Sequence, residues 1–331
     1  MVITKTPFRM SFFGGGTDMK EFYEEYGGSI LSTTFDKYCY VTVRHLPEFF
    51  KYTSEFVYSN TERVTDVDQI QHPLIRNCMK FQNMHHIRLA YDADLPARTG
   101  LGTSSSFAVG MLNAFHALNG EMIDKKRLAD EAIYAERVLC HEAGGIQDQI
   151  AASFGGLNRI DMDKDGYHVS PLVISRERKL ELNNSLMLFF TGFSHMSAVV
   201  QEKVKENFQN KVRRLQRMKD MVNEAQKILI NQGNIGEFGR LLHESWQLKR
   251  SLSRGISTND IDSMYETARK AGAKGGKLLG SGGGGFLLFF VEKDKQPFVK
   301  KALEKLLYVP FSFETDGTRI IYYKEEDSEK V

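Results

Sequence analysis

Residues 96–106 combine glycines with hydroxyl side chains in a pattern that suits phosphate binding. The stretch reads Pro-Ala-Arg-Thr-Gly-Leu-Gly-Thr-Ser-Ser-Ser and lies between a strand-like run at 87–91 and a helix-like run at 107–118. Gly100 and Gly102 allow positive φ and close approach of a ligand to the backbone. The amide groups at a helix start attract anions, and nearby hydroxyls donate to phosphate oxygens or ligate a hard cation.

A helix cap after a turn is the simpler interpretation of this stretch, because Ser and Thr are ordinary caps. Two glycines and four hydroxyls directly before a helix favour a phosphate-binding loop instead. The common phosphate loop, Gly-x-x-x-x-Gly-Lys-Ser/Thr, is absent, and so is a dinucleotide Gly-x-Gly-x-x-Gly after a strand.

Three further stretches carry residues that suit a ligand site. Residues 14–18 read Gly-Gly-Gly-Thr-Asp, which is a flexible turn or a bare backbone on which a ligand lies beside the Asp18 carboxylate. Asp148 follows two glycines in the first turn of a predicted helix, where it is a cap or a functional carboxylate. Residues 280–285 are glycines except Ser281, and strand-like flanks favour a loop inside a sheet that approaches a ligand closely.

The elements that must position these stretches alternate between strands and helices. We expect strands at 6–13, 29–35, 38–44, 87–91, 157–160, 167–174, 185–190, 286–291 and 309–323. We expect helices at 19–26, 73–81, 107–118, 125–140, 197–231, 234–252 and 292–306. The polar segment 175–184 is the predicted domain boundary.

The predicted helix 234–252 carries three cationic or titratable side chains, His243, Lys249 and Arg250. One of them is a candidate for holding a phosphate group of a substrate. Trp246 on the same helix is expected in the core rather than in a stacking platform.

Composition narrows the class of protein. The 331 residues carry 44 basic and 42 acidic side chains, a net charge of +2, which gives no reason to invoke a nucleic acid or a membrane surface as partner. No apolar run approaches the roughly 18–20 residues of a membrane span. Three widely spaced cysteines without a Cys-x-x-Cys pair fit reduced thiols in a cytoplasmic protein.

The pattern Pro-x-x-x-Gly-Leu-Gly-Thr-Ser-x-Ser at 96–106 resembles the nucleotide loop of the GHMP kinases. Two other stretches resemble motifs of that family in the same order, namely residues 7–18 and 277–286. Residues 145–149, Gly-Ile-Gln-Asp-Gln, are similar to the segment that carries the proposed catalytic base of galactokinases. Gly15 and Gly16 replace the Glu-His of galactokinases, and the resulting Phe-Phe-Gly-Gly-Gly-Thr-Asp form is similar to the D-glycero-D-manno-heptose 7-phosphate kinase branch.

The resemblance implies a role for each stretch. It implies an α+β fold of two domains: an N-terminal ribosomal-protein-like ATP-binding domain over residues 1–180 and a C-terminal ferredoxin-like domain over 181–331, with the active site in the cleft between them. It implies Asp148 as catalytic base beside Arg9, and Ser104 with Glu136 as magnesium ligands. The implied ATP-binding residues are Arg98, Thr99, Gly100, Leu101, Gly102, Thr103, Ser104, Ser105 and Ser106. The implied substrate-binding residues are Gly14, Gly15, Gly16, Thr17, Asp18, Gly282 and Gly283.

The activity implied by the resemblance is a sugar 1-kinase that uses ATP and Mg²⁺. The branch resemblance implies D-glycero-D-manno-heptose 7-phosphate as substrate, converted to the 1,7-bisphosphate for surface-polysaccharide precursors. Two alternatives stay open: a kinase for a free sugar such as fucose, and a non-catalytic sugar sensor of the same fold. The partners expected are ATP and a sugar phosphate, with no nucleic acid and no membrane, and a homodimer is among the oligomeric states left open.

Overall fold

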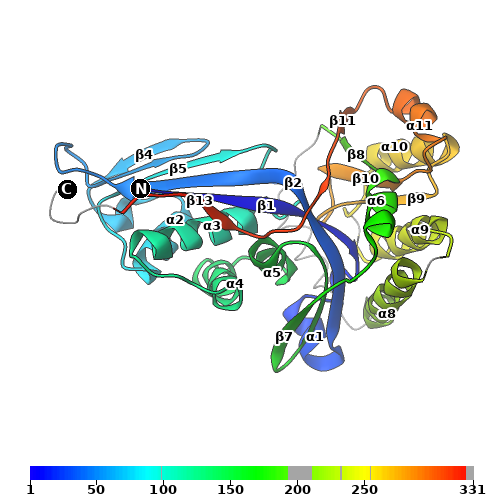
Figure 1. Cartoon of the computed structure of the whole chain (residues 1–331), viewed down its shortest axis with the longest axis horizontal. Coiled ribbons are helices and arrows are strands. Elements are labelled where there is room, and N and C mark those ends of the chain that lie inside the picture. The colour runs from blue at the N-terminus through cyan, green and yellow to red at the C-terminus, as the bar shows by residue number, and fades with distance from the viewer. Residues whose placement is uncertain (98, 193–210, 232, 254, 326–331) are drawn as a thin grey trace.

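The computed structural model describes residues 1–97, 99–192, 211–231, 233–253 and 255–325. Its strands form two sheets that lie at opposite ends of an elongated molecule (Figure 1). The amino group of Met1 donates to the Lys324 carbonyl at 2.7 Å, so these two residues lie side by side at the end that holds the larger sheet. No helix within these residues is long and apolar enough to cross a lipid bilayer. Cys39, Cys78 and Cys140 are all free thiols.

The larger sheet has nine strands, which run in the order β13-β1-β2-β5-β3-β4, with β12 and β6 also paired to β2 and β7 paired to β6. These strands are β1 (Val2–Phe13), β2 (Gly28–His45), β3 (Ser54–Val57), β4 (Thr61–Val64), β5 (Ile87–Ala93), β6 (Leu157–Asp163), β7 (Gly166–Pro171), β12 (Phe313–Glu314) and β13 (Arg319–Tyr323). All pairings are antiparallel except that of β3 with β5.

The smaller sheet has four antiparallel strands in the order β11-β8-β10-β9. They are β8 (Leu186–Phe190), β9 (Gly275–Leu278), β10 (Phe286–Phe290) and β11 (Leu307–Val309). Strand β10 is buried along its whole length, because its five residues are all apolar and helices cover the sheet.

The helices divide between the two sheets. The larger sheet carries α1 (Lys20–Tyr26), α2 (Pro73–Phe81), α3 (Thr103–Leu118), α4 (Lys125–Tyr134) and α5 (Gln147–Phe154), with the short turns η1 (Val67–Gln69) and η2 (Ala135–Leu139). The smaller sheet lies beside α6 (Arg176–Asn184), α8 (Val212–Ile230), α9 (Gly236–Arg250), α10 (Asn259–Lys270) and α11 (Gln296–Ala302) (Figure 1).

Strand β1 joins the two halves of the molecule, because elements of both halves bury it. Its first residues alternate between buried and half-buried, whereas every residue from Thr6 to Phe13 is buried. Helices α3 and α5 contact β1, and so do α8 and α9 from the other half. One hydrophobic cluster therefore contains Phe12 and Phe13 of β1 together with Phe238 of α9 and Leu288 of β10.

Several elements differ from the sequence expectation. Residues 28–45 form one strand, β2, rather than two, because an irregularity in its register against β1 near Pro7 absorbs the break. The expected polar boundary at 175–184 is helix α6, which Ser175 caps by accepting from the Arg178 amide. Helix α10 was not expected. Part of the expected helix 197–231 lies outside the described residues.

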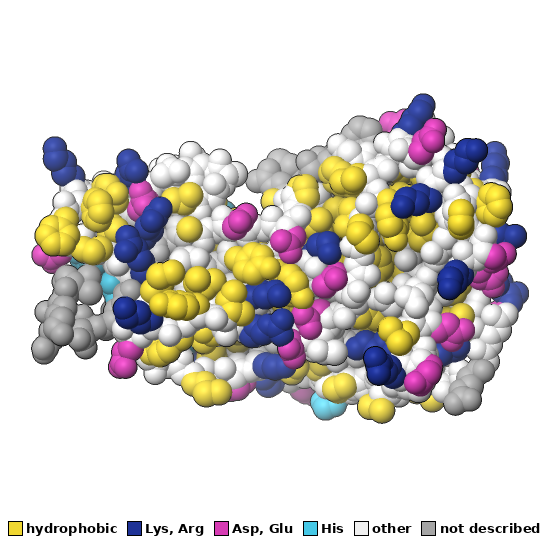
Figure 2. All heavy atoms as spheres, turned by 45° about the horizontal axis from the view of Figure 1, so that its top comes forward, with side chains coloured by type: hydrophobic (Ala, Val, Ile, Leu, Met, Phe, Trp, Pro, Cys, Tyr) yellow, Lys and Arg dark blue, Asp and Glu magenta, His cyan; other side chains and the backbone are white. Residues whose placement is uncertain are grey.

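The expected two-domain α+β fold is confirmed in its main parts, with each sheet carrying its own helices. Strands β12 and β13 return to the larger sheet, where β13 pairs with β1 and β12 with β2. A division of the chain at residue 180 therefore leaves these last two strands in the first sheet, although they follow the boundary. On the face shown in Figure 2, basic and acidic side chains are interspersed, in line with the small net charge.

Candidate active site

The loop before α3 has the backbone that its glycines permit. Gly100 and Gly102 both have positive φ, of 81° and 75°. A Cβ at Gly100 would lie 2.5 Å from the Leu279 carbonyl oxygen, and one at Gly102 would lie 3.2 Å from the Cγ of Arg9. Both positions therefore require glycine for conformation and for space.

The hydroxyl residues of this loop face different surroundings. Ser104 is exposed at the first turn of α3, a helix of 16 residues that is otherwise almost wholly buried. The Ser105 hydroxyl donates to Glu136, and the Ser106 hydroxyl donates to the Pro7 carbonyl. Thr99 and Leu101 are fully buried, backbone included, so neither residue is accessible to a ligand in this structure. Arg98, the remaining predicted loop residue, lies outside the described residues.

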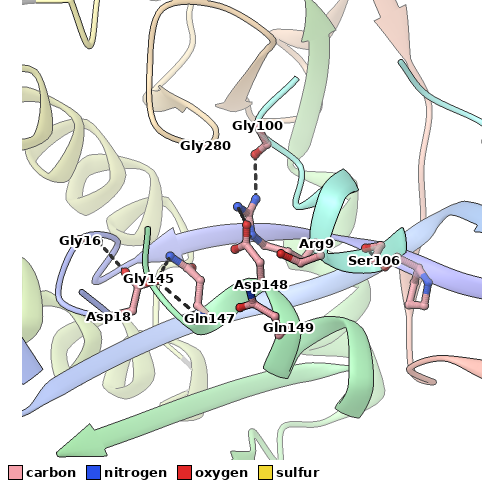
Figure 3. A network of polar contacts seen from close by, with 12 residues as sticks. Arg9, Gly16, Asp18, Gly100, Ser106, Gly145, Gln147, Asp148, Gln149 and Gly280 are labelled. Carbon is pink, nitrogen blue, oxygen red and sulfur yellow. Dashed lines mark hydrogen bonds and ion pairs between the residues drawn. The ribbon is translucent and has the colours of Figure 1, made fainter. Parts of the chain in front are cut away.

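Arg9 and Asp148 form a bidentate ion pair beside this loop (Figure 3). Arg9 Nε donates to Asp148 Oδ1 at 2.7 Å, and Nη2 donates to Oδ2 at 2.9 Å. The third guanidinium nitrogen, Nη1, donates to the Gly100 carbonyl at 2.8 Å. The side chain of Arg9 is 5% exposed and that of Asp148 is 23% exposed, so the carboxylate is the member of the pair that solvent reaches.

Glu136 lies on the other side of the helix start, on η2. This single π-type turn follows α4 and interrupts the helix expected over 125–140. Glu136 is 1% exposed and accepts from Ser104 Oγ at 2.9 Å, from Ser105 Oγ at 2.6 Å and from the amide of Gln149. All three donors are neutral groups.

The surroundings of Glu136 fit a hard divalent cation held jointly with a ligand. A hydroxyl and a carboxylate are oxygen donors of the kind that Mg²⁺ uses, with substrate phosphates completing the set. Within the described ranges, no group of three or more His, Cys, Asp and Glu side chains is arranged to hold a metal. Such a cation would therefore depend on phosphate oxygens for most of its ligands.

Asp18 ties the glycine turn at 14–18 to the start of α5. Its carboxylate accepts from the Gly16 amide at 2.9 Å and from the side-chain and backbone amides of Gln147 at 2.9 and 3.4 Å. Gly145 passes so close that a Cβ there would overlap the carboxylate. Burial, and next the charge of Asp148, raise the pKa of Asp18 above its ordinary value.

The glycines of the turn have a structural reason that the sequence did not reveal. A Cβ at Gly14 would overlap the Ser29 carbonyl, and one at Gly16 would lie 3.2 Å from Leu215 of α8. Thr17 is buried and donates to Ser29 O at 3.0 Å. Close packing on the chain itself thus requires these glycines, while Gly15 has only the Ser11 hydroxyl near its Cβ position, at 3.8 Å.

The glycine loop after β9 also packs against the chain. Gly280 lies on Gly100, Gly285 lies on Thr99, and a Cβ at Gly282 would lie 2.6 Å from the Cα of Ile256. The Gly283 amide donates to the Ile256 carbonyl at 3.0 Å. This loop from the second half therefore rests directly on the loop before α3, and the close approach seen in the structure is one between these two loops.

The structure brings most of the predicted residues together and adds others. Arg9, Asp148 and Asp18 meet the two glycine loops around the start of α5 (Figure 3). Glu136 is joined to α3 by the hydroxyl of Ser104 and to α5 by the amide of Gln149. Sequence reasoning missed Gln147 and Gln149, although both stand in the quoted segment 145–149 beside Asp148. Their amide donors are used within the site, and their buried Oε1 atoms have no hydrogen-bond partner.

The three candidate cations of helix 234–252 have different partners in the structure. His243 Nδ1 is 2.8 Å from the Tyr265 hydroxyl, and Arg250 pairs with Asp262 at 2.6 Å. Lys249 is buried and reaches the carbonyl groups of the loop after β9. Trp246 is fully buried, as expected.

Two family descriptions match the chain. The GHMP kinases N terminal domain matches residues 72–156, and the GHMP kinases C terminal domain matches residues 225–309. Together they cover just over half of the 331 residues (85 and 85). The first match contains the loop before α3 and the segment with Asp148, and the second contains the loop after β9.

Known proteins resemble the chain over nearly all or over part of its length. D-glycero-alpha-D-manno-heptose 7-phosphate kinase of Campylobacter jejuni subsp. jejuni is 28% identical over 96% of this chain and 97% of its own. L-fucokinase/L-fucose-1-P guanylyltransferase of Bacteroides fragilis is 31% identical, over 63% of this chain and 22% of its own. The crystal structure of a D-glycero-D-manno-heptose 1-phosphate kinase from Bacteroides thetaiotaomicron superposes with a TM-score of 0.80, at 26% identity, over 98% of this chain and 100% of that one.

Proposed function

The chain belongs to the GHMP kinases and is a phosphotransferase that acts on a sugar hydroxyl, and we propose that it transfers the γ-phosphoryl group of ATP to C1 of D-glycero-D-manno-heptose 7-phosphate. The product would be the 1,7-bisphosphate, a precursor for surface polysaccharide. We place this reaction in the cytoplasm, where the free thiols of the chain are stable.

The Arg9–Asp148 pair is the observation that carries the proposal. Asp148 is held in one orientation by two hydrogen bonds from Arg9 and is still partly exposed, so a sugar hydroxyl can donate to it. A carboxylate in this position orients the attacking hydroxyl and accepts its proton. Arg9 also contacts Gly100, so its positive charge lies next to the loop where the phosphoryl group would arrive and stabilises the charge that develops there.

The start of α3 would hold the nucleotide. Its positive end, the exposed Ser104 and the half-buried Gly100 and Gly102 are suited to the phosphates of ATP. Ser104 and Glu136 would hold Mg²⁺, which when bound would neutralise charge on the phosphate oxygens. Ser105 and Gln149 donate to Glu136 and fix its orientation.

The sugar would lie between Asp148 and the turn at 14–18. Asp18 is only 3% exposed and accepts from Gly16 and Gln147, so its direct contribution to a sugar would be one remaining lone pair. The heptose assignment rests on the relative named for that substrate, which matches the chain from end to end. Gly15, in place of the Glu of galactokinases, leaves space at the turn, since only the Ser11 hydroxyl lies near its Cβ position, at 3.8 Å.

An ADP-release assay with Mg-ATP tests the proposal. The acceptors are heptose 7-phosphate, free heptose, fucose and galactose, each at the same concentration. We expect turnover with heptose 7-phosphate only. Turnover that is equal or higher with a free sugar would overturn the assignment of heptose 7-phosphate as substrate, while the assignment of the protein as a sugar kinase would stand.

A kinase for free fucose is the second candidate, because the relative named for fucokinase is 31% identical over part of the chain. The non-catalytic sensor is disfavoured by the intact geometry, since Arg9, Asp148, Ser104 and Glu136 are all in hydrogen-bond contact with their partners. Sugar binding by calorimetry without ADP release would support the sensor.

A further inference from the structure

Lys249 is a buried lysine at the contact between the two halves of the molecule. It lies in the last turn of α9, is 8% exposed, and donates through Nζ to the Leu278 carbonyl at 3.2 Å and to the Gly280 carbonyl. These two carbonyls belong to the turn that leads from β9 into the glycine loop. The ammonium group therefore bridges the two carbonyl groups of this turn.

The turn that Lys249 holds is part of a continuous line of contacts to the reacting carboxylate. Gly280 packs on Gly100 so closely that a Cβ on either residue would overlap the other backbone (Figure 3). The Gly100 carbonyl accepts from Arg9, and Arg9 holds Asp148. A shift of Gly280 would therefore move the carbonyl that fixes the third nitrogen of Arg9.

The charges around Lys249 leave it without a carboxylate partner. Within the described parts of the chain neither Lys249 nor the neighbouring buried Lys277 forms an ion pair, and Lys277 donates to the Phe12 carbonyl at 2.8 Å. The charged groups that act on Lys249 are Arg9 from β1, Asp18 from the turn after β1, and Lys277 from β9. Burial first, and then the repulsion from Arg9, lower the pKa of Lys249 to about 7.

We propose that Lys249 is a positioning residue for phosphoryl transfer, which holds the Leu278–Gly280 turn on Gly100 and thereby fixes the carbonyl that orients Arg9 against Asp148. This inference rests on the proposed kinase function. It differs from the expectation that Lys249 holds a substrate phosphate, because its hydrogen bonds go to backbone carbonyls and its side chain is buried.

The proposal has a consequence for pH dependence. The ammonium form donates charge-assisted hydrogen bonds to the two carbonyls, whereas the neutral amine is a weak donor with a lone pair that carbonyl oxygens repel. The free enzyme should therefore lose kcat/KM as pH rises through about 7. An arginine in this position stays protonated throughout that range.

The test compares the wild type with Lys249→Met and Lys249→Arg in the ADP-release assay from about pH 6 to about pH 9. We expect Lys249→Met to lower kcat by about 10- to 100-fold, with KM for the sugar changed less than about threefold, and to lose the alkaline fall in kcat/KM. Lys249→Arg should recover part of the rate and move the fall to higher pH. Lys219→Met is the matched control, since Lys219 on α8 also donates to a backbone carbonyl, that of Tyr26 at 2.6 Å, but does not touch the glycine loop.

The outcomes distinguish a failure of the role proposed for Lys249 from a failure of the proposed kinase function. A wild-type enzyme without an alkaline fall in kcat/KM overturns the role of Lys249 and leaves the kinase intact, and so does a Lys249→Met variant with the wild-type rate and profile. An equal loss in Lys219→Met also overturns it, because the loss would then be a general effect on folding. Wild-type protein without turnover on any sugar overturns the proposed function itself, before any variant is compared.

Discussion

Two carboxylates of the site, Asp148 and Glu136, are held in opposite ways. Asp148 is paired with a guanidinium group in two hydrogen bonds and is 23% exposed. Glu136 is 1% exposed and receives hydrogen bonds only from two serine hydroxyls and an amide. The first forms an ion pair with Arg9, whereas the second forms no ion pair within the described residues.

The difference assigns the two groups different partners. A carboxylate that is already paired and still reachable suits a neutral hydroxyl, whose proton it can accept without a large change in its surroundings. A buried carboxylate without a cation is unfavourable until a cation arrives. On the basis of this contrast we propose that the sugar hydroxyl binds at Asp148 and the metal ion at Glu136.

The largest effect should come from Asp148→Asn. The variant removes the proton acceptor and leaves Arg9 buried with a neutral partner, so we expect kcat to fall by about 10²-fold or more. ADP release under saturating substrates measures it. Asp262→Asn is the matched control, because Asp262 also pairs with an arginine, Arg250, but lies on α10. Turnover of Asp148→Asn close to the wild-type value would refute the assigned base.

A second substitution, at Glu136, should have opposite effects on stability and on magnesium-dependent activity. Glu136→Gln replaces a buried carboxylate, which has no ion-pair partner among the described residues, by a neutral amide, so the metal-free variant should melt at the wild-type temperature or above it. The same variant should need about 10-fold or more magnesium for half-maximal rate, because one anionic ligand is lost. A magnesium titration and a melting curve without metal measure the two effects. Unchanged magnesium dependence would contradict the metal assignment.

Gly280→Ala tests how far the geometry at Asp148 depends on the second half of the molecule. The new methyl group would overlap Gly100, so we expect the loop to shift and kcat to fall by about 10-fold. Gly120→Ala is the control, since Gly120 has nearly the same φ, 74° against 76°, and open space around it. Gly120→Ala should lower the free energy of unfolding by only roughly 1–2 kcal/mol, because alanine is strained at this φ. Equal kcat values in the two variants would show that the contact between Gly280 and Gly100 does not affect catalysis.

The smallest effect concerns a third carboxylate, Asp18, whose pKa is raised by burial and by Asp148. In the window between its ordinary value of 3.8 and the raised one, the folded state binds more protons than the unfolded state, so stability falls as pH rises. Asp18→Asn should remove this fall, with Gln147 turning its unpartnered Oε1 toward the new amide. Melting temperatures measured across that window check it, and parallel curves for the two proteins would contradict the shift.

Local patterns in the sequence were enough to find the parts of the site. The loop at 96–106 stands out because glycines and hydroxyls lie between a strand and a helix, and Asp148 because two glycines precede it. The strand signal of 6–13 and the helix signal of 73–81 were equally local; the structure confirms them as β1, which begins earlier at Val2, and α2. The pairing of Arg9 with Asp148 was expected from family resemblance rather than from spacing.

Contacts between distant segments were beyond reach of the sequence. Gly14, Gly280 and Gly285 are glycines because other backbone segments press on them, and a sequence does not show which segments those are. The π-type turn at Glu136 and the return of β13 to β1 likewise depend on packing. Lys249 was noticed as a cation, but its burial under the glycine loop comes from the way α9 packs on β9.

Phosphorus NMR of the reaction with heptose 7-phosphate is the most direct test of the account. We predict that a second phosphorus signal grows, coupled to the anomeric proton of the sugar, while the original 7-phosphate signal is retained, and that Asp148→Asn shows neither change on the same time scale. A new phosphate ester at any other carbon, or no new signal from the wild-type protein, would contradict the assignment of Asp148 and Arg9 to phosphoryl transfer at C1.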